Sequence, residues 1–248
     1  MLALYEDRHG RIWATGPPSL VLHQTDTDKG DAFAIVNCPP TSKLGGFTED
    51  AQGRIWVAPR NTRIWRVDGN TLVRDGPPPR ALAASIRALL FDPEGALWIG
   101  TLGAGIYRWS SLGLQHYTTE DGLPNNSVLG LAVDGLGNLW ITSHNGIIGC
   151  SRRQFANYVH GKSPPLLRQH LGLDEGLPDA TCSGSGQPVI EQDSAGWFWA
   201  ATMSGAAGFD PRGLPGPTGK VNIETLKLDG LAVRPADGEI RAPGDRVV

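Results

Sequence analysis

The sequence predicts an all-β fold, a β-propeller of about five four-stranded blades. The skeleton Asp-x-x-Gly-x-(Ile/Leu/Phe)-Trp occurs five times, as DRHGRIW, DAQGRIW, DPEGALW, DGLGNLW and DSAGWFW. Its tryptophans, Trp13, Trp56, Trp98, Trp140 and Trp199, are 43, 42, 42 and 59 residues apart. Glycine and proline are frequent, at 33 and 19 of 248 residues, which indicates many tight turns. Repeats of about 40–50 residues with four short strands each are typical of propellers.

Each repeat can be divided into strands by its apolar alternation. In the third repeat we expect strands at 85–92, 96–101, 106–110 and 114–117, and in the fourth at 127–134, 138–143, 147–151 and 155–159. The blade cores are therefore expected near 1–40, 41–78, 79–119, 120–160 and 161–212. The long last interval is explained by insertions on both sides of Gly176-Leu177-Pro178.

The repeated Asp, Gly and Trp have a structural explanation. An aspartate at the end of a first strand accepts hydrogen bonds from amides of the next turn, and the glycine three residues later supplies a positive φ. The tryptophan then lies on the second strand, where its large ring fills the space between adjacent blades. Five copies favour a structural role, so we expect these tryptophans in the core.

The strand order determines where a ligand would bind. The first-to-second and third-to-fourth turns share one face, while the second-to-third turns and the crossings between blades share the other. The second face collects loops that vary in sequence at repeating positions, which suits a binding surface on a rigid scaffold. The candidate ligand-binding residues, chosen for this face and for hydrogen-bonding capacity, are Arg60, Asn61, Thr101, Asn125, Asn126, His144 and Asn145.

Composition excludes several functions. The formal net charge is −3, so no basic field favours nucleic acid or an anionic membrane surface. No apolar run is long enough to span a bilayer. Cys38, Cys150 and Cys182 have no metal-ligand spacing and are expected as buried or semi-buried free thiols. No catalytic motif, metal site or cofactor is expected.

Residues 116–147, HYTTEDGLPNNSVLGLAVDGLGNLWITSHNGI, resemble the repeat of the two-component regulator propeller family. The resemblance covers about residues 1–210, strongly in this repeat and more loosely in the other four. It implies a periplasmic ligand-sensing module of an inner-membrane signalling protein, binding a small polar or oligosaccharide ligand. The parent protein would carry a histidine kinase or diguanylate cyclase, and the 248 residues themselves would not be an enzyme.

Residues 213–248 lack the propeller skeleton and alternate as strands around an Asp229-Gly230 turn. They are similar to the opening strands of the β-sandwich domain, named for its triple tyrosine motif, that follows propellers in this family. Both ends of the chain look cut, so we expect a fragment of a larger propeller. A homodimer through the sandwich domain or through missing blades is a further expectation.

Two alternatives stay open at this point. Streptogramin lyases share the blade turn, so the chain is also compatible with a free-standing propeller enzyme, and His144 is the histidine to test for it. A passive protein-interaction scaffold is the other alternative, and a large exposed apolar patch on the blade faces would favour it.

Overall fold

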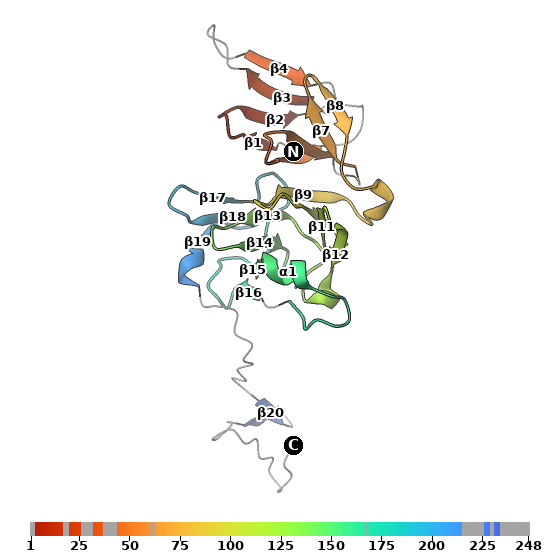
Figure 1. Ribbon diagram of the computed structural model, residues 1–248. Coiled ribbons are helices and arrows are strands. Elements are labelled where there is room, and N and C mark those ends of the chain that lie inside the picture. The colour runs from red at the N-terminus through yellow and green to blue at the C-terminus, as the bar shows by residue number, and fades with distance from the viewer. Residues whose placement is uncertain are drawn as a thin grey trace. The chain divides into compact units, whose positions relative to one another are not determined.

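The structure is a computed structural model that describes residues 3–16, 20–25, 32–36, 44–59, 61, 63–166, 168–214, 226–228 and 231–233. Its described residues form four four-stranded sheets, one three-stranded sheet and one two-stranded sheet, with very little helix (Figure 1). In the four four-stranded sheets and the three-stranded sheet, strands that follow one another in the chain lie side by side and pair antiparallel. The predicted propeller fold is confirmed.

The strands of each blade are named A to D in chain order. Blade 1 has β1 (Leu4–Glu6), β2 (Ile12–Gly16), β3 (Leu20–Thr25) and β4 (Ala32–Val36). Blade 2 has β5 (Leu44–Glu49), β6 (Ile55–Pro59), β7 (Trp65–Asp68) and β8 (Thr71–Arg74). Blade 3 has β9 (Ile86–Phe91), β10 (Leu97–Thr101), β11 (Ile106–Ser110) and β12 (Gly113–Tyr117). Blade 4 has β13 (Gly130–Val133), β14 (Asn138–Ser143), β15 (Gly146–Ser151) and β16 (Arg168–Leu171). Blade 5 has β17 (Ile190–Gln192), β18 (Phe198–Thr202) and β19 (Gly205–Phe209).

The predicted strands of the third repeat agree with the structure, but the last strand of the fourth repeat is wrong. Residues 155–159 were expected to pair at the edge of the sheet, whereas α1 (Arg152–Asn157) occupies most of this stretch. The edge strand is instead β16, which lies beyond the expected blade limit of residue 160. The chain leaves the sheet after Ser151, forms the helix and returns. Short 3₁₀ turns lie at Pro79–Ala81, Thr119–Asp121 and Pro211–Gly213.

The chain divides into two compact units, 1–216 and 217–248. In the second unit, β20 (Leu226–Leu228) pairs antiparallel with β21 (Leu231–Val233). The expected Asp229-Gly230 turn lies outside the described residues. The β-sandwich therefore stays a prediction.

A hydrogen bond between aspartate and tryptophan is repeated in all five blades. The indole Nε1 donates to the carboxylate Oδ2 at 2.8–2.9 Å, from Trp13 to Asp7 and equivalently in each later blade. The other carboxylate oxygen accepts from backbone amides of the turn, as in Asp134, whose Oδ1 binds the amides of Leu136 and Asn138. The glycine of this turn has a positive φ, 91° at Gly137. The predicted roles of aspartate and glycine are confirmed.

Four of the five repeated tryptophans are buried against the next blade. Trp140, for example, is fully buried and lies 4.8 Å from the Phe209 ring of blade 5. The prediction is wrong for Trp199, whose side chain is 49% exposed. Its ring lies against Gly208 of its own sheet, where a Cβ would be 3.0 Å away. The described residues place no further sheet on this side of blade 5, so the same motif leaves the ring in solvent.

Gln187 connects the A strands of the propeller unit. Its carbonyl accepts from the amide of Leu4 at 3.2 Å, within a parallel bridge that links the start of blade 1 to the start of blade 5. Its side-chain Nε2 donates to the carbonyls of Arg87 at 2.9 Å and of Leu129 at 3.0 Å, in blades 3 and 4. The side chain of Gln187 thus links blades 3 and 4, and its backbone links blades 1 and 5.

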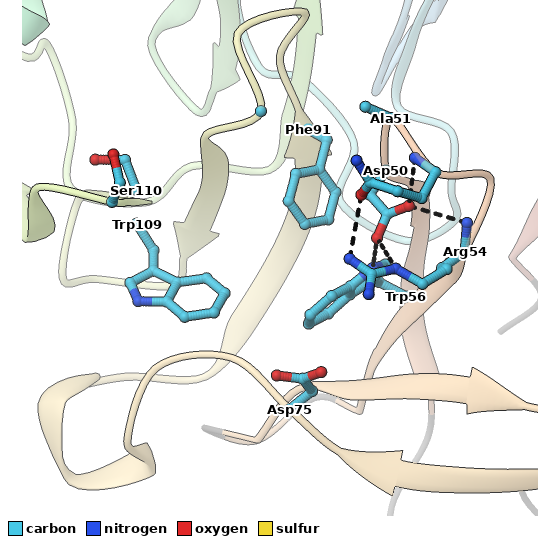
Figure 2. Close-up of a pocket in the computed structure, with 11 residues that line it drawn as sticks. Asp50, Ala51, Arg54, Trp56, Asp75, Phe91, Trp109 and Ser110 are labelled. Atoms are coloured by element: carbon cyan, nitrogen blue, oxygen red, sulfur yellow. Dashed lines mark hydrogen bonds and ion pairs between the residues drawn. The ribbon is translucent and has the colours of Figure 1, made fainter.

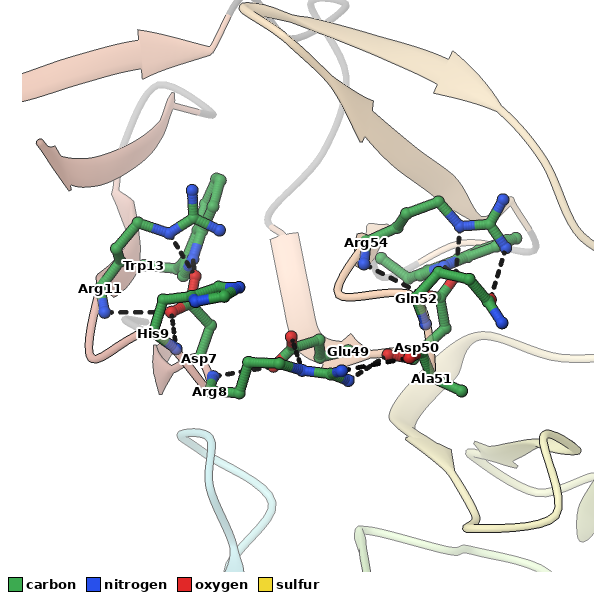
Figure 3. Close-up of polar contacts among 11 residues, drawn as sticks. Asp7, Arg8, His9, Arg11, Trp13, Glu49, Asp50, Ala51, Gln52 and Arg54 are labelled. Carbon is green, nitrogen blue, oxygen red and sulfur yellow. Dashed lines mark hydrogen bonds and ion pairs between the residues drawn. The ribbon is translucent and has the colours of Figure 1, made fainter.

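Neighbouring blades are also joined at their A-to-B turns. Arg8 of blade 1 forms an ion pair with Glu49 and donates to the carbonyls of Asp50 and Ala51 in blade 2 (Figure 3). The amide of Arg8 donates to Glu49 Oε2 at 2.9 Å. The turns are therefore tied to each other as well as to their own tryptophans.

Cys150 and Cys182 are buried free thiols, as expected, and Cys38 lies outside the described residues. Burial raises the pKa of Cys150 to about 12 and that of Cys182 to about 11. Both thiols are therefore protonated at neutral pH, whereas the thiolate is the reactive form.

Candidate functional site

The face that carries the B-to-C turns and the crossings between blades is here called the loop face. On this face Asn125, in the crossing from blade 3 to blade 4, donates from Nδ2 to Asn145 Oδ1 at 3.3 Å. Asn145 belongs to the B-to-C turn of blade 4, and its carbonyl lies 2.8 Å from His170 Nε2 on the outer strand β16. Three separate segments therefore bring polar side chains together.

The backbone explains why these segments are so close. Gly146, the first residue of β15 after the B-to-C turn, has φ 97°, and a Cβ there would lie 2.3 Å from the carbonyl oxygen of Leu171. Only glycine allows the turn to approach the end of β16 this closely. The approach places His170 beside Asn145.

The loop-face cluster, defined as Asn125, Asn145, His170 and Glu175, also includes a carboxylate. His170 Nδ1 lies 3.5 Å from Glu175 Oε2, and both side chains are about 40% exposed. Glu175 Oε2 also accepts from the amide of Gly172 at 2.8 Å. The cluster therefore contains amide, imidazole and carboxylate groups, which together can donate and accept hydrogen bonds.

The other expected ligand residues have different surroundings. Thr101 is fully buried and donates its hydroxyl to the Gly105 carbonyl at 2.7 Å. The Oδ1 atom of Asn126 accepts from the Thr119 amide at 2.9 Å, which stabilises the crossing from blade 3 to blade 4. Both side chains stabilise loops. Asn61 does the same in blade 2, where its Oδ1 accepts from the Arg63 amide at 2.8 Å.

His144 and Arg60 complete the expected set. His144 is exposed in the B-to-C turn of blade 4, next to Asn145. Arg60 lies outside the described residues. Of the seven expected residues, the structure brings Asn125 and Asn145 into direct contact and leaves His144 adjacent to them.

His170 and Glu175 were missed from the sequence. The contact of His170 with the B-to-C turn depends on the pairing of β15 with β16, in which Ile148 lies opposite His170, and Glu175 joins the cluster through His170. That pairing spans the inserted helix α1, and no repeat in the sequence fixes its register. The sequence therefore carried no usable signal for these two residues.

Asp179 is a further ionisable group of the loop face, in the crossing from blade 4 to blade 5. The Thr181 amide donates to it at 2.8 Å and the Ser204 hydroxyl donates at 2.8 Å. These hydrogen bonds lower the pKa of Asp179, so it is a carboxylate at neutral pH. Among the described residues, no group of three His, Cys, Asp or Glu is arranged to hold a metal ion.

A pocket of about 400 Å³ lies on the opposite face, here called the turn face because it carries the A-to-B and C-to-D turns. It opens between blades 2 and 3 and is walled by Trp56, Phe91 and Trp109 (Figure 2). Asp50 and Asp75 are its carboxylates. The sequence did not predict this pocket, because only the face with the variable loops was expected to bind a ligand.

Two stretches of the chain, residues 82–103 and 122–145, match the family model described as Two component regulator propeller. These stretches lie in the third repeat and in the crossing and first two strands of the fourth. The match confirms, in these two stretches, the resemblance seen in the sequence. Among curated proteins, none matches this sequence at a significant level.

Solved structures share the fold at low sequence identity. The extracellular domain of BT4673 from B. thetaiotaomicron, described as a one component system, is 20% identical with a TM-score of 0.63, over 85% of this chain and 29% of that domain. The extracellular domain of the same organism's BT3049, described as a hybrid two component system, is 18% identical with a TM-score of 0.60, over 96% of this chain and 33% of that domain. The chain thus spans about a third of the length of these extracellular domains.

Enzymes share the fold as well. A catalytically inactive virginiamycin B lyase from Staphylococcus aureus, solved with quinupristin, is 18% identical with a TM-score of 0.58, over 83% of this chain and 64% of that chain. At such identities the likeness establishes the propeller fold only. Within the described part of this chain, no helix is both long and apolar enough to cross a membrane.

Proposed function

We propose that this chain is the sensing module of a transmembrane signalling protein, that it lies outside the cytoplasm, and that its loop face binds a small polar molecule or an oligosaccharide. The regulator propeller repeats and the likeness to extracellular domains of bacterial signalling proteins support the sensing role. The loop-face cluster is the single observation that carries the choice of site.

The cluster suits a sensor because it joins three segments that are separate in the chain. Asn125, Asn145 and His170 come from a crossing, a turn and an outer strand, and each retains exposed polar atoms. A ligand that binds all three stabilises one arrangement of these segments over another. Signalling requires such a difference in affinity between two arrangements, and binding alone does not provide it.

Thermal unfolding of the protein with a panel of neutral sugars, amino acids and short peptides tests this proposal. A ligand at about 100 times its Kd adds about 2.7 kcal/mol to the free energy of unfolding, which raises the melting temperature. We expect a raised melting temperature with at least one compound, and its loss in Asn145→Ala. Asn157→Ala, at the exposed end of α1, is the matched control and should retain the shift. A panel without any shift, or a shift that survives Asn145→Ala, would contradict the proposal.

An enzyme of the lyase type is the second candidate. The fold is shared with virginiamycin B lyase, and His170 with Glu175 supplies a histidine and carboxylate pair on the loop face. Incubation with quinupristin separates the two candidates. Turnover that is lost in His170→Ala or in His144→Ala supports an enzyme, whereas an unchanged substrate supports the sensor.

A further inference from the structure

The pocket between blades 2 and 3 has the features of a second ligand site, on the face opposite the loop-face cluster. We propose that it binds a neutral sugar, a mono- or disaccharide, with the sugar ring against Trp109. The volume of about 400 Å³ lies within the range of about 300–1,000 Å³ that small-molecule sites occupy. This inference does not depend on the proposed loop-face site.

The walls of the pocket are three aromatic rings from two blades. Trp56 comes from strand B of blade 2, while Phe91 and Trp109 come from strands A and C of blade 3. The Trp56 ring meets Phe91 at 5.3 Å and 64°, and meets Trp109 at 6.5 Å and 62°. Trp56 is buried, whereas Phe91 and Trp109 are only half-buried and so present apolar surface to the pocket. A large aromatic surface left partly open is a favourable platform for the apolar face of a ligand.

The equivalent space between blades 3 and 4 is closed by groups that the pocket lacks. There Arg152, which directly follows β15, forms an ion pair with Glu94 of the facing A-to-B turn. By strand register, Ser111 corresponds to Arg152, and Gln52 corresponds to Glu94. Ser111 and Gln52 both line the pocket, so an uncharged pair stands where an ion pair closes the next space.

Paired charges indicate a neutral ligand. Arg54 Nε lies 2.6 Å from Asp50 Oδ2, and Arg66 Nε lies 3.1 Å from Asp75 Oδ2. Each carboxylate of the pocket therefore already has a guanidinium partner. The Arg54 guanidinium also lies 6.0 Å from the centre of the Trp56 ring, where it disfavours a cationic ligand. An anion or a cation would meet one unfavourable charge for each favourable one.

The polar groups around the rings select a sugar among neutral compounds. Gln52, Asp75, Ser110 and Ser111 line the pocket with one amide, one carboxylate and two hydroxyls. These groups donate and accept hydrogen bonds around the edge of the aromatic platform. A sugar ring has the matching arrangement, since its hydroxyls point outward and one face carries C–H groups. A purely apolar ligand would displace water from these polar groups without giving them new hydrogen bonds.

Titration calorimetry and tryptophan fluorescence of the full chain test the proposal with three groups of probes. The neutral probes are the methyl glycosides of glucose, galactose and mannose, together with cellobiose, lactose and maltose. The charged probes are glucuronate, glucosamine and choline. We expect saturable binding of at least one neutral probe, weakened roughly 30-fold or more in Trp109→Ala because an aromatic anchor is removed. Trp199→Ala, which removes an exposed tryptophan of blade 5, should leave binding unchanged.

A second variant tests the pocket without removing a wall. Gln52→Glu combined with Ser111→Arg rebuilds the ion pair of the neighbouring space and should close the pocket, so that binding is lost while the melting temperature is retained. Asn145→Ala should not affect this binding, which separates it from binding at the loop face. The proposal is overturned if no neutral probe binds at about 10 mM, if binding survives Trp109→Ala or the closing variant, or if choline binds instead.

Discussion

The space between blades 3 and 4 and the space between blades 2 and 3 each lie beside a tryptophan of the repeated motif. The first space is filled, whereas the second is an open pocket. On one side Trp98 is completely buried, and its ring meets the fully buried Phe155 of α1 at 5.1 Å and 74°. On the other side Trp56 faces Phe91 and Trp109 across a pocket of about 400 Å³. The difference is the six-residue helix α1, inserted in blade 4 and absent at the corresponding point of blade 3, where Ser111 leads directly into β12. A single short insertion therefore decides whether a space between blades is core or pocket.

The largest expected effect is the loss of the group that fills the closed space. Phe155→Ala should lower the free energy of unfolding by about 3–5 kcal/mol, because a fully buried aromatic is replaced by a cavity. Trp109→Ala in the open space should cost no more than about 2 kcal/mol, since its side chain is half exposed. Urea unfolding of both variants measures the difference. Equal losses would show that the two spaces are equally packed.

The Asp–Trp hydrogen bond should contribute similarly on both sides. Asp50→Asn and Asp92→Asn each replace a buried carboxylate that accepts from an indole at 2.8 Å. We expect each to lower the free energy of unfolding by about 1.5–3 kcal/mol, the range for hydrogen bonds to charged groups. Asp193→Asn in blade 5 is the matched control, because its carboxylate is exposed, and should cost less. A larger loss at Asp193 would contradict the importance of burial.

Low pH should lower the free energy of unfolding through Asp50, which lines the pocket between blades 2 and 3. Burial raises the pKa of Asp50, but hydrogen bonds from Trp56 and Arg54 outweigh it and hold the pKa below its usual 3.8. Since the folded pKa is lower than the unfolded one, the carboxylate stabilises the fold above about pH 4, and this contribution is lost as the pH falls through the lowered pKa. Urea unfolding between about pH 7 and pH 3 should show a shallower loss for Asp50→Asn than for the unmodified chain. An identical slope would mean that Asp50 does not contribute.

The smallest expected effect is at the mouth of the closed space. Arg152→Ala removes the ion pair with Glu94 and should lower the free energy of unfolding by about 0.5–1 kcal/mol, because Glu94 is exposed to solvent. The loss should shrink at high salt, which screens exposed charges. Measurement at low and high ionic strength checks both points. Ser111→Ala at the corresponding position of the pocket should be neutral.

Much of the fold could be predicted because the repeated contacts are local. Asp7, for instance, binds the amides of His9 and Arg11 and the indole of Trp13, all within six residues. Less of the candidate site could be predicted. Asn125 and Asn145 form a hydrogen bond, as expected for residues on the same face. Thr101, in contrast, binds within its own turn, and His170 lies on a strand whose register could not be predicted from the sequence.

By itself the sequence determined the number of repeated units, the strands of a typical blade and the turn that joins strand A to strand B. These features depend on hydrogen bonds between residues four and six positions apart, which every copy of the motif repeats. The tertiary structure decided which tryptophan is exposed, which space between blades is open and which loop side chains meet. Those outcomes depend on neighbours from other blades, such as Phe155 beside Trp98, and no short pattern in the chain encodes such a distant neighbour.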